Sequence, residues 1–375
     1  MSMAQLAIIH NIPIHYKHLL FSELARRGLE FEVLFLASGS SNRIEVPDLS
    51  SAPYRSRVGF EGTYEASPGW RTASFVWRSL NQIRPRCVII SGWADAGAWT
   101  AKLWCFLHRC ASILWAESNQ CDRARVWWKE LAKTIFVRGF DGAQVCGTTN
   151  AEYLAALGFD SRRICVKCSP ADTGLFGLAE QREPQLNSRK VILFVGRLIP
   201  KKNIEFVLEA VRLLSLEARQ ALRFRFVGYG PLETSLRLKA ESLGLNDTVE
   251  FDGPRIHSQL AETYHSADVL LLPSTSEPWG LTVIEAMLCG LPVILSERCG
   301  CARDLVNPGT GWSFNPHDAG AFAQILQKVA AMPTQELRAM GRNAAALASG
   351  YSPEQCASSV LQCLSMTTHY ASIAA

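Results

Sequence analysis

Three short segments in the second half of the chain hold side chains that bind anions and hydroxyl groups. The first, Gly196-Arg-Leu-Ile-Pro-Lys-Lys202, follows an apolar run typical of a buried strand and precedes a helical pattern. That order places Arg197 and Lys202 at the carboxyl end of the strand, where two cations can neutralise a diphosphate and Gly196 lets the backbone approach it. A solvated basic turn would have the same sequence.

The second segment, Val227-Gly-Tyr-Gly-Pro231, is a glycine-rich turn between a predicted strand and a predicted helix. Gly228 and Gly230 could leave backbone N–H groups open to an anion at the start of that helix. The third glycine of the dinucleotide fingerprint is absent, and no acidic residue follows at the ribose spacing, so the turn is weak evidence for a nicotinamide dinucleotide. A simple tight turn explains the glycines equally well.

The third segment carries two carboxylates eight residues apart, Glu277 on a polar loop and Glu285 in a predicted helix. The helix begins near Gly280, so the N–H groups of Gly280, Leu281 and Thr282 should be open to phosphate oxygens or sugar hydroxyls. Carboxylates accept hydrogen bonds from hydroxyls, which makes a polyol with a nearby phosphate a natural ligand. In the alternative, Glu277 only complements the helix dipole and Glu285 is an exposed charge, although its apolar neighbours argue against the latter.

Strand and helix patterns that alternate along the whole chain must position these segments, which predicts an α/β protein with parallel sheets. At 375 residues the chain is too long for one ordinary core, so two doubly wound domains facing a cleft are expected. We predict a first domain over 1–178, a linker over 179–189, a second domain over 190–350 and a last helix within 351–375 that crosses back to the first domain. Ligands of such sheets bind beyond the carboxyl ends of the strands.

The individual elements follow from the apolar runs and periodicities. Strands are expected at 6–10, 31–36, 87–91, 112–115, 143–146, 164–168, 191–195, 224–227, 248–251, 269–272 and 292–295. Helices are expected at 17–27, 96–109, 124–138, 149–157, 204–214, 232–243, 317–331, 334–348 and 353–366. Residues 38–72 show little periodicity and are expected to form a loop or an irregular flap.

In this order, the three segments resemble the retaining family 4 glycosyltransferases, whose fold is GT-B. The resemblance rests on the G-R-L-x-x-x-K pattern, the V-G-x-G-P turn and E-x7-E within S-E-P-W-G-L-T-V-I-E-A-M-x-C-G-x-P-V-I, and it covers most of residues 140–350. It weakens toward the amino terminus. The segment from Asp172 to Phe176 is similar to the one that leads into the family's interdomain region.

The resemblance implies transfer of a hexose-type sugar from a nucleoside diphosphate to an acceptor hydroxyl, with retention of configuration. Arg197 and Lys202 would hold the diphosphate and stabilise the leaving nucleotide, Glu277 would bind the transferred sugar, and Glu285 would bind the ribose. No cofactor is expected, and no metal is required because no D-x-D-like motif stands out. The acceptor would be a glycan or a lipid-linked precursor in bacterial surface polysaccharide or lipid-linked glycan biosynthesis.

Acceptor chemistry cannot be carried over in the same way. The family's glycine-rich loop after the first strand is replaced here by a stretch that contains His15 and Lys17, and a later strand is followed by Ser-Gly-Trp-Ala-Asp95. His15, Lys17, Asp95 and Glu117 are therefore candidates for the acceptor side, and a structural role is at least as good an explanation for each of them.

Two other functions fit the same architecture. A nucleotide-sugar epimerase would need acid and base groups around the sugar and would act on the donor without an acceptor. A catalytically silent subunit that binds a nucleotide sugar would be free to lose Arg197, Lys202, Glu277 and Glu285, yet this chain keeps all four.

Charge and hydropathy limit the partners. The formal charge of +4 is too small to indicate nucleic-acid binding, and the whole excess of bases lies in residues 1–185. No secretory signal opens the chain and residues 87–107 read as a strand and a helix rather than a membrane span, so we expect a cytoplasmic protein.

A basic helix at 124–138 carries Trp127 and Trp128, and with the arginine-rich region 43–86 it could rest on anionic lipid at the inner face of the membrane. In the alternative, Trp127, Leu131 and Ile135 belong to the core and the bases form a solvated face.

The cysteines are scattered, which fits a reducing compartment. Cys165 and Cys168 form a C-x-x-C on a predicted strand, where side chains three residues apart face opposite ways, and no second ligand pair is present. We therefore expect a structural role for this pair, as for Cys299 and Cys301.

Overall fold

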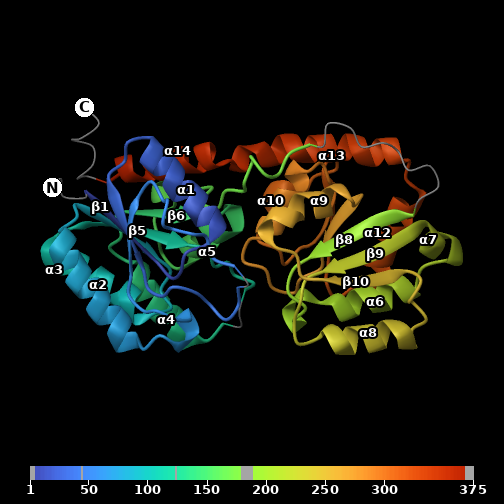
Figure 1. Cartoon of the computed structure of the whole chain (residues 1–375), viewed down its shortest axis with the longest axis horizontal. Coiled ribbons are helices and arrows are strands. Elements are labelled where there is room, and N and C mark those ends of the chain that lie inside the picture. Colours follow the sequence, from blue (N-terminus) through green and yellow to red (C-terminus); the bar gives the residue numbers. More distant parts are fainter. Residues whose placement is uncertain (1–4, 44, 123–124, 179–188, 368–375) are drawn as a thin grey trace. The chain divides into compact units, whose positions relative to one another are not determined.

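A computed structural model describes residues 5–43, 45–122, 125–178 and 189–367. The chain divides into two compact units. The first is drawn from Met1–Gln120, Ala124–Pro170 and Pro353–Ala375, and the second from Ala171–Ser352 with a short segment at Cys121–Arg123. Each unit contains a parallel sheet covered by helices, which confirms the predicted α/β class (Figure 1).

The sheet of the first unit has seven parallel strands in the order β3-β2-β1-β4-β5-β6-β7. Most of these strands are continuous apolar runs because both faces of the sheet are covered. The strands are β1 (Leu6–His10), β2 (Phe31–Phe35), β3 (Arg55–Val58), β4 (Cys87–Ser91), β5 (Ala111–Ala116), β6 (Gly142–Val145) and β7 (Ile164–Val166).

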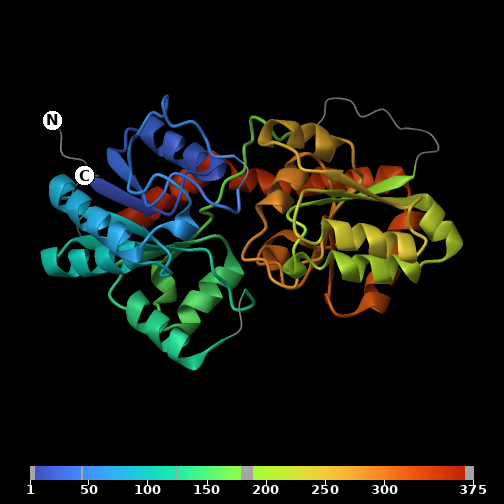
Figure 2. The same cartoon turned by 60° about the horizontal axis from the view of Figure 1, so that its bottom comes forward.

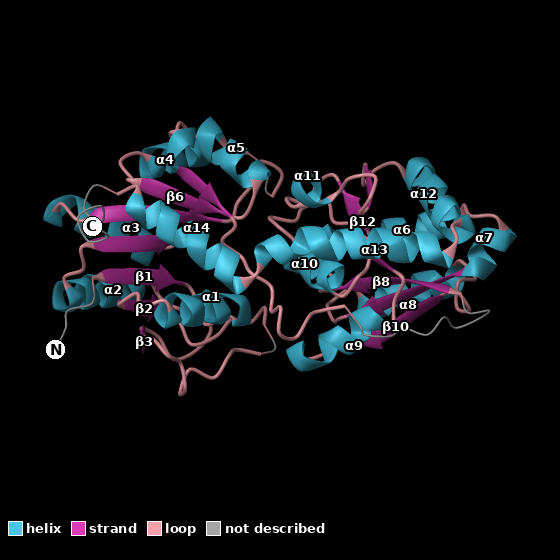
Figure 3. Cartoon of the chain, turned by 90° about the horizontal axis from the view of Figure 1, so that it is seen from above, coloured by secondary structure: helices cyan, strands magenta, loops and turns pink. Residues whose placement is uncertain are grey.

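The helices of the first unit cover its sheet on two faces. One core joins the strands to α2 (Gly69–Ile83), α3 (Ala96–His108), α4 (Trp127–Val137) and α5 (Thr148–Ala156), which come forward in Figure 2. On the other face α1 (His15–Arg26) packs against α14 (Pro353–Ser365), and α14 also contacts β6 and β7 (Figure 3). Two short 3₁₀ turns complete the unit, η1 (Tyr64–Ala66) and η2 (Ser161–Arg163).

The sheet of the second unit has six parallel strands in the order β10-β9-β8-β11-β12-β13. They are β8 (Lys190–Val195), β9 (Leu222–Val227), β10 (Val249–Gly253), β11 (Val269–Leu272), β12 (Val293–Ser296) and β13 (Gly311–Phe314). Figure 1 shows α6 and α8 on one side of this sheet and α9, α10 and α13 on the other.

The helices of the second unit are α6 (Ile204–Arg212), α7 (Leu216–Ala221), α8 (Glu233–Ser242), α9 (Leu260–His265), α10 (Leu281–Leu288), α11 (Ala302–Leu305), α12 (Ala319–Ala331) and α13 (Thr334–Ala348). The 3₁₀ turns are η3 (Pro200–Lys202), η4 (His257–Gln259) and η5 (Ser349–Tyr351). No helix in the described ranges is long and apolar enough to cross a membrane.

The strand order reverses once in each sheet, between β1 and β4 in the first and between β8 and β11 in the second. At such a point the connections leave toward opposite faces, so a crevice forms beyond the carboxyl ends of the two strands. The sites of interest should therefore lie in the loops that follow these strands.

The expectation for residues 38–72 was wrong in part. Arg55–Val58 forms edge strand β3, which pairs with β2, and helix α2 already begins at Gly69. The strand was not predicted because its sequence, Arg-Ser-Arg-Val, contains no apolar run. The helix has buried residues at helical spacing, Thr72, Val76, Leu80 and Ile83, and this signal was available in the sequence.

Domain boundaries also differ from the expected ones. Ala171–Ser352 form one unit, so residues 171–178 group with the second sheet rather than the first. The expected linker, 179–189, lies outside the described residues except for Arg189. The last helix, α14, packs on α1 and on β7, both in the first unit.

Candidate functional site

The reversal of strand order in the second sheet brings the three predicted segments into neighbouring loops. β8 ends at Val195 and the adjacent β11 ends at Leu272, so the loops that start at Gly196 and at Pro273 leave the same edge of the sheet. The two loops are joined directly, because the N–H of Thr275 donates a hydrogen bond of 2.9 Å to the carbonyl of Lys201.

An ion pair connects two of the predicted site residues. The Lys202 ammonium donates to a carboxylate oxygen of Glu277, and the two side chains are only 13% and 14% exposed. An ammonium has three N–H donors, so this bond leaves two others for a ligand. Lys202 therefore holds Glu277 at the edge of the sheet, a contact that sequence reasoning did not anticipate.

Arg197 lies in the same loop as Lys202 but is not held in the same way. Its side chain is half-buried, and its Nε is buried without a hydrogen-bond partner among the described residues. A buried donor without a partner costs free energy, and the cost is recovered when an acceptor arrives. Arg197 therefore has the property expected of a residue that binds an anion.

Gly228 and Gly230 have a steric role in the structure. A Cβ at Gly228 would lie 1.8 Å from the carbonyl oxygen of Gly196, and one at Gly230 would lie 2.2 Å from that of Leu198. The two loops are also bonded, since the N–H of Leu198 donates to the carbonyl of Tyr229 at 2.7 Å. The glycine turn thus supports the loop that carries Arg197 and Lys202.

Glu285 lies near the middle of α10, just over one turn from its start, and is 5% exposed. Its carboxylate accepts a 2.7 Å hydrogen bond from the hydroxyl of Tyr264 on α9. Burial, together with the charge of Glu285, raises the pKa of Tyr264 well above its ordinary value, so the phenol stays protonated and keeps donating. Sequence reasoning missed Tyr264, which carries no local signal of this contact.

The start of α10 has the form that the sequence predicts. Gly280 precedes the helix with φ 107°, a conformation that favours glycine, and a Cβ there would lie 3.2 Å from the Cys301 sulfur. Leu281 and Thr282 form the first turn, whose N–H groups have no carbonyl four residues earlier within the helix. The half-buried first turn can therefore donate to a ligand.

A second group of residues lies near the end of β10. The carboxylate of Asp172 is 3.9 Å from the His257 imidazole, and this contact lowers the pKa of Asp172. The Phe176 ring packs edge-on against His257 at 5.5 Å and against Tyr264 at 5.7 Å. Through Tyr264, these rings are continuous with Glu285.

In the first unit, Lys17 and Glu117 form an ion pair of 2.9 Å at the carboxyl edge of the sheet. Lys17 is 1% exposed, donates to the Cys168 carbonyl at 3.0 Å and lies 3.6 Å from the centre of the Trp115 ring. Burial is the largest single influence on both groups and opposes their charges. The attraction between the two groups, together with smaller contributions from their neighbours, outweighs it, which raises the pKa of Lys17 and lowers that of Glu117. Both groups are therefore ionised, and Lys17 is a buried counter-charge.

The other two acceptor-side candidates, Asp95 and His15, lie at the amino-terminal ends of helices. Asp95 caps α3 by accepting from the N–H of Ala98 at 2.9 Å, and it also accepts from the Tyr64 hydroxyl at 3.3 Å. His15 is the first residue of α1 and is half-buried. The structure thus brings together Lys17 and Glu117, whereas Asp95 caps the amino terminus of α3.

The cysteines of the C-x-x-C motif contact different neighbours, but only Cys165 lies on a strand, because β7 ends at Val166 and not at residue 168 as expected. Cys168 contacts the sulfur of Cys146 at 3.6 Å, while Cys165 contacts the sulfur of Met366 at 3.9 Å. Within the described residues, only Glu117, Cys146 and Cys168 are grouped closely enough to hold a metal ion. The Lys17 ammonium already neutralises that carboxylate, so these residues do not fit a divalent cation well.

Comparison with known proteins finds a matching family model and similar enzymes. Residues 179–347 match the family model described as glycosyl transferases group 1. A D-inositol 3-phosphate glycosyltransferase of Gordonia bronchialis is 28% identical over 353 residues, which cover 86% of this chain and 77% of the relative. Its counterpart in Rhodococcus erythropolis is 26% identical and covers 91% of this chain and 83% of the relative.

Solved structures resemble the whole chain. HepE of Anabaena, in complex with UDP, has a TM-score of 0.75 at 17% identity and covers 96% of this chain and 99% of its own. A glycosyltransferase of Rickettsia africae also has a TM-score of 0.75, at 14% identity, and covers 96% of this chain and 98% of its own. These similarities establish the two-sheet GT-B architecture.

The relatives named here are transferases, which favours transfer over the epimerase and the silent binding subunit. The chain is therefore a glycosyltransferase with the GT-B fold, and its residues 179–347 match the family model for glycosyl transferases group 1.

Proposed function

We propose that this enzyme moves a sugar from a nucleoside-diphosphate sugar to an acceptor hydroxyl and retains the anomeric configuration. The observation that carries the proposal is Arg197, a half-buried cation at the carboxyl edge of β8 whose Nε finds no partner within the described part of the chain. Such a group can donate charge-assisted hydrogen bonds to a diphosphate. HepE of Anabaena, which shares the fold, has been solved with UDP and with UDP-glucose, and this supports the same class of donor here.

Each of the neighbouring residues would bind a different part of the donor. Arg197 and the free donors of Lys202 would stabilise the negative charge that grows on the leaving diphosphate. Glu277, held by Lys202, would accept hydrogen bonds from the transferred sugar, assisted by the first turn of α10. Glu285, fixed by Tyr264, would bind the ribose hydroxyls.

Retention follows if the acceptor approaches on the face from which the diphosphate leaves. The acceptor oxygen then bonds to the anomeric carbon, the bond from that carbon to the diphosphate oxygen breaks, and the acceptor proton passes to the departing phosphate. Glu277 and Glu285 act in binding and do not serve as the acid and base of a glycosidase. Two cations supply the charge stabilisation, so we propose that transfer needs no metal ion and continues in excess EDTA.

The second substrate of the transfer is the acceptor that supplies the hydroxyl. We propose a glycan or lipid-linked acceptor in bacterial surface polysaccharide or lipid-linked glycan biosynthesis, bound on the side of the first unit that carries Glu117. Curated relatives are named for an inositol phosphate acceptor, so that compound belongs in any acceptor screen. A cytoplasmic enzyme with a lipid-linked acceptor would work as a peripheral protein at the inner face of the membrane.

Thermal unfolding with a panel of UDP-, GDP-, ADP- and dTDP-sugars tests the donor site. A ligand that binds only the folded state at 100 times its Kd stabilises it by about 2.7 kcal/mol, so one nucleotide family should raise the Tm. Arg197→Ala should abolish the shift. Arg212→Ala removes an exposed arginine of the same unit and should keep it. A wild-type enzyme whose Tm does not respond to any of these sugars would contradict the proposed donor class.

A further inference from the structure

The outward faces of α3 and α4 in the first unit are apolar. Their large side chains are between 42% and 79% exposed: Trp99, Leu103, Phe106 and Leu107 on α3, and Trp127, Trp128, Leu131 and Ile135 on α4. The alternative that Trp127, Leu131 and Ile135 belong to the core is therefore wrong. A surface helix normally presents polar side chains to water, and both helices do the opposite.

The two helices lie side by side. They follow the neighbouring strands β4 and β5, and their inner residues share one core. The Trp99 ring of α3 lies 4.7 Å from the Phe136 ring of α4. Because Trp127, Leu131 and Ile135 recur at helical spacing, they form a stripe beside that of α3. We call these two stripes the α3–α4 face.

Basic side chains flank the α3–α4 face, and its one acidic side chain is neutralised. Glu130 is the only carboxylate of the two helices, and it pairs with Lys133 at 2.7 Å and with Arg125 at 3.3 Å. Lys129 is exposed and lies 5.3 Å from the Trp128 ring. The surroundings of the face therefore favour an anionic partner.

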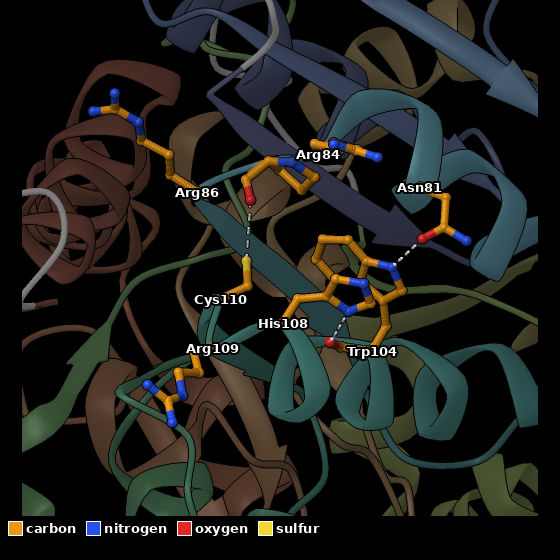
Figure 4. A pocket seen from close by; sticks show the side chains of 8 residues that line it. Asn81, Arg84, Arg86, Trp104, His108, Arg109 and Cys110 are labelled. Carbon is orange, nitrogen blue, oxygen red and sulfur yellow. Dashed lines mark hydrogen bonds between the residues drawn. The ribbon is translucent and has the colours of Figure 1, made fainter.

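A pocket of about 580 Å³ at the carboxyl end of α3 extends this positive charge. Arg84, Arg86 and Arg109 line it together with Trp104 and His108, whose rings stack at 4.2 Å (Figure 4). Among the described residues these arginines form no ion pair. The pocket lies near the first residues of β4 and β5, at the edge of the sheet opposite to Glu117.

We propose that the α3–α4 face docks the first unit onto an anionic lipid leaflet, with the arginine-lined pocket taking headgroup phosphates. Tryptophan and phenylalanine side chains enter the boundary between headgroups and acyl chains, and each base near an anionic surface adds further attraction. The biological meaning of this docking rests on the proposed function, since a lipid-linked acceptor would be presented at such a surface.

Flotation of the full-length protein with vesicles tests the docking. Wild type should float with phosphatidylcholine vesicles that contain phosphatidylglycerol, and more weakly with phosphatidylcholine alone. The double variant Phe106→Ala, Trp127→Ala removes two side chains that are 79% and 78% exposed, so it should fold normally and lose about tenfold or more in partitioning. The matched control is Leu216→Ala, Leu238→Ala, which removes two exposed leucines of the second unit and should bind as wild type does.

A charge variant tests the pocket separately. Arg84→Gln, Arg86→Gln, Arg109→Gln should weaken binding to anionic vesicles by about fivefold or more for each base that contacts lipid and leave binding to neutral vesicles unchanged. Arg342→Gln, an exposed arginine on α13, is the control. Soluble glycerol phosphate at millimolar concentration should not displace the protein from vesicles, because it lacks the acyl chains that the apolar face requires.

Three results would overturn the proposal: no flotation of wild type on anionic vesicles, equal flotation of wild type and the Phe106–Trp127 variant, or a dimer in solution that this variant abolishes. The last would assign the face to a second copy of the chain. Donor binding separates a failure of the docking proposal from a failure of the proposed function. The nucleotide-sugar Tm shift is measured without lipid and should be the same in this variant as in wild type.

Discussion

Arg197 and Lys202 carry the same charge in one loop but contact different groups. Lys202 is paired with Glu277, whereas the Nε of Arg197 has no partner in the described ranges. Arg197→Ala should lower kcat by about 10²–10³-fold, the usual cost of one group that stabilises transition-state charge, with little change in the free energy of unfolding.

Lys202→Ala, in contrast, should also destabilise the fold by about 3 kcal/mol, because it leaves the largely buried Glu277 carboxylate without its cation. The double variant Lys202→Met, Glu277→Gln should recover most of that stability and none of the activity. Urea unfolding together with steady-state rates separates the two effects. Equal stability losses for Arg197→Ala and Lys202→Ala would contradict this assignment.

The Lys17–Glu117 pair should respond asymmetrically to substitution. Lys17 is 1% exposed and Glu117 is 40% exposed, so only the carboxylate can be rehydrated when its partner is removed. We expect Glu117→Gln to cost about 3 kcal/mol and Lys17→Met to cost less. The contribution of the pair should be complete between about pH 4.5 and pH 10.5, the ordinary pKa values of the two groups. It should be lost as pH falls from 4.5 through the lowered pKa of Glu117, or rises from 10.5 through the raised pKa of Lys17. Chemical unfolding of both variants across pH measures each effect.

His10 supplies a pH dependence of its own. Burial, with the Lys17 charge second, lowers its pKa from 6.5 to about 4, so the folded protein keeps this imidazole neutral while the unfolded chain protonates it. Stability from His10 is complete above pH 6.5 and is lost as pH falls toward 4, by up to about 3 kcal/mol. His10→Asn should flatten the slope of unfolding free energy in that window. An unchanged slope would remove His10 as its source.

At the scale of the element, the loop that holds Arg197 depends on the glycine turn beside it. Gly228→Ala would place a methyl group 1.8 Å from the Gly196 carbonyl oxygen, so the two loops would have to separate. We expect a loss of about 3 kcal/mol or more and no donor binding. Gly244→Ala is the matched control, since Gly244 also has a positive φ but has nothing within 4 Å of an added Cβ, and it should cost only about 1 kcal/mol. Urea unfolding and the donor Tm shift report both changes.

Local signals were sufficient for many elements of this fold. Apolar runs such as Val269–Leu272 and helical periodicities such as Thr334–Ala348 were recognisable because burial decides both. β3 was missed because its residues, Arg55–Val58, are held by pairing to β2 and by contacts such as Arg57 with Glu32. Edge strands of this kind depend on their neighbour more than on their own hydropathy.

The candidate site could also be predicted only in part, because its residue types are local signals but its contacts are not. The residue types of Arg197, Glu277 and Glu285 pointed to an anion and a polyol from their place after strands. Their partners could not be predicted, because the contact between Lys202 and Glu277 depends on the adjacency of β8 and β11. The hydrogen bond from Tyr264 to Glu285 likewise joins two residues that lie 21 positions apart in the chain, on different helices.

At the scale of the whole molecule, the first unit is built from both ends of the sequence. α14 buries one face against α1, β6 and β7, and Arg27 of the first unit donates to Ser358 at 2.8 Å and to the Glu354 carbonyl at 2.9 Å. Deletion of residues 353–375 should therefore destabilise the first unit while the second keeps its core. Limited proteolysis should cut the first unit much faster in the truncated chain, with the nucleotide-sugar Tm shift of the second unit retained. Equal protection of both units after truncation would show that α14 contributes little.

This arrangement also bears on how the protein is made. As the chain leaves the ribosome, every strand of the second sheet emerges before Pro353, so that unit can finish folding while the first still lacks its final helix. Domains usually complete in the order of their synthesis. Here the half that is translated first is completed last, and until α14 emerges the nascent chain exposes the surface of β6 and β7 that this helix will cover.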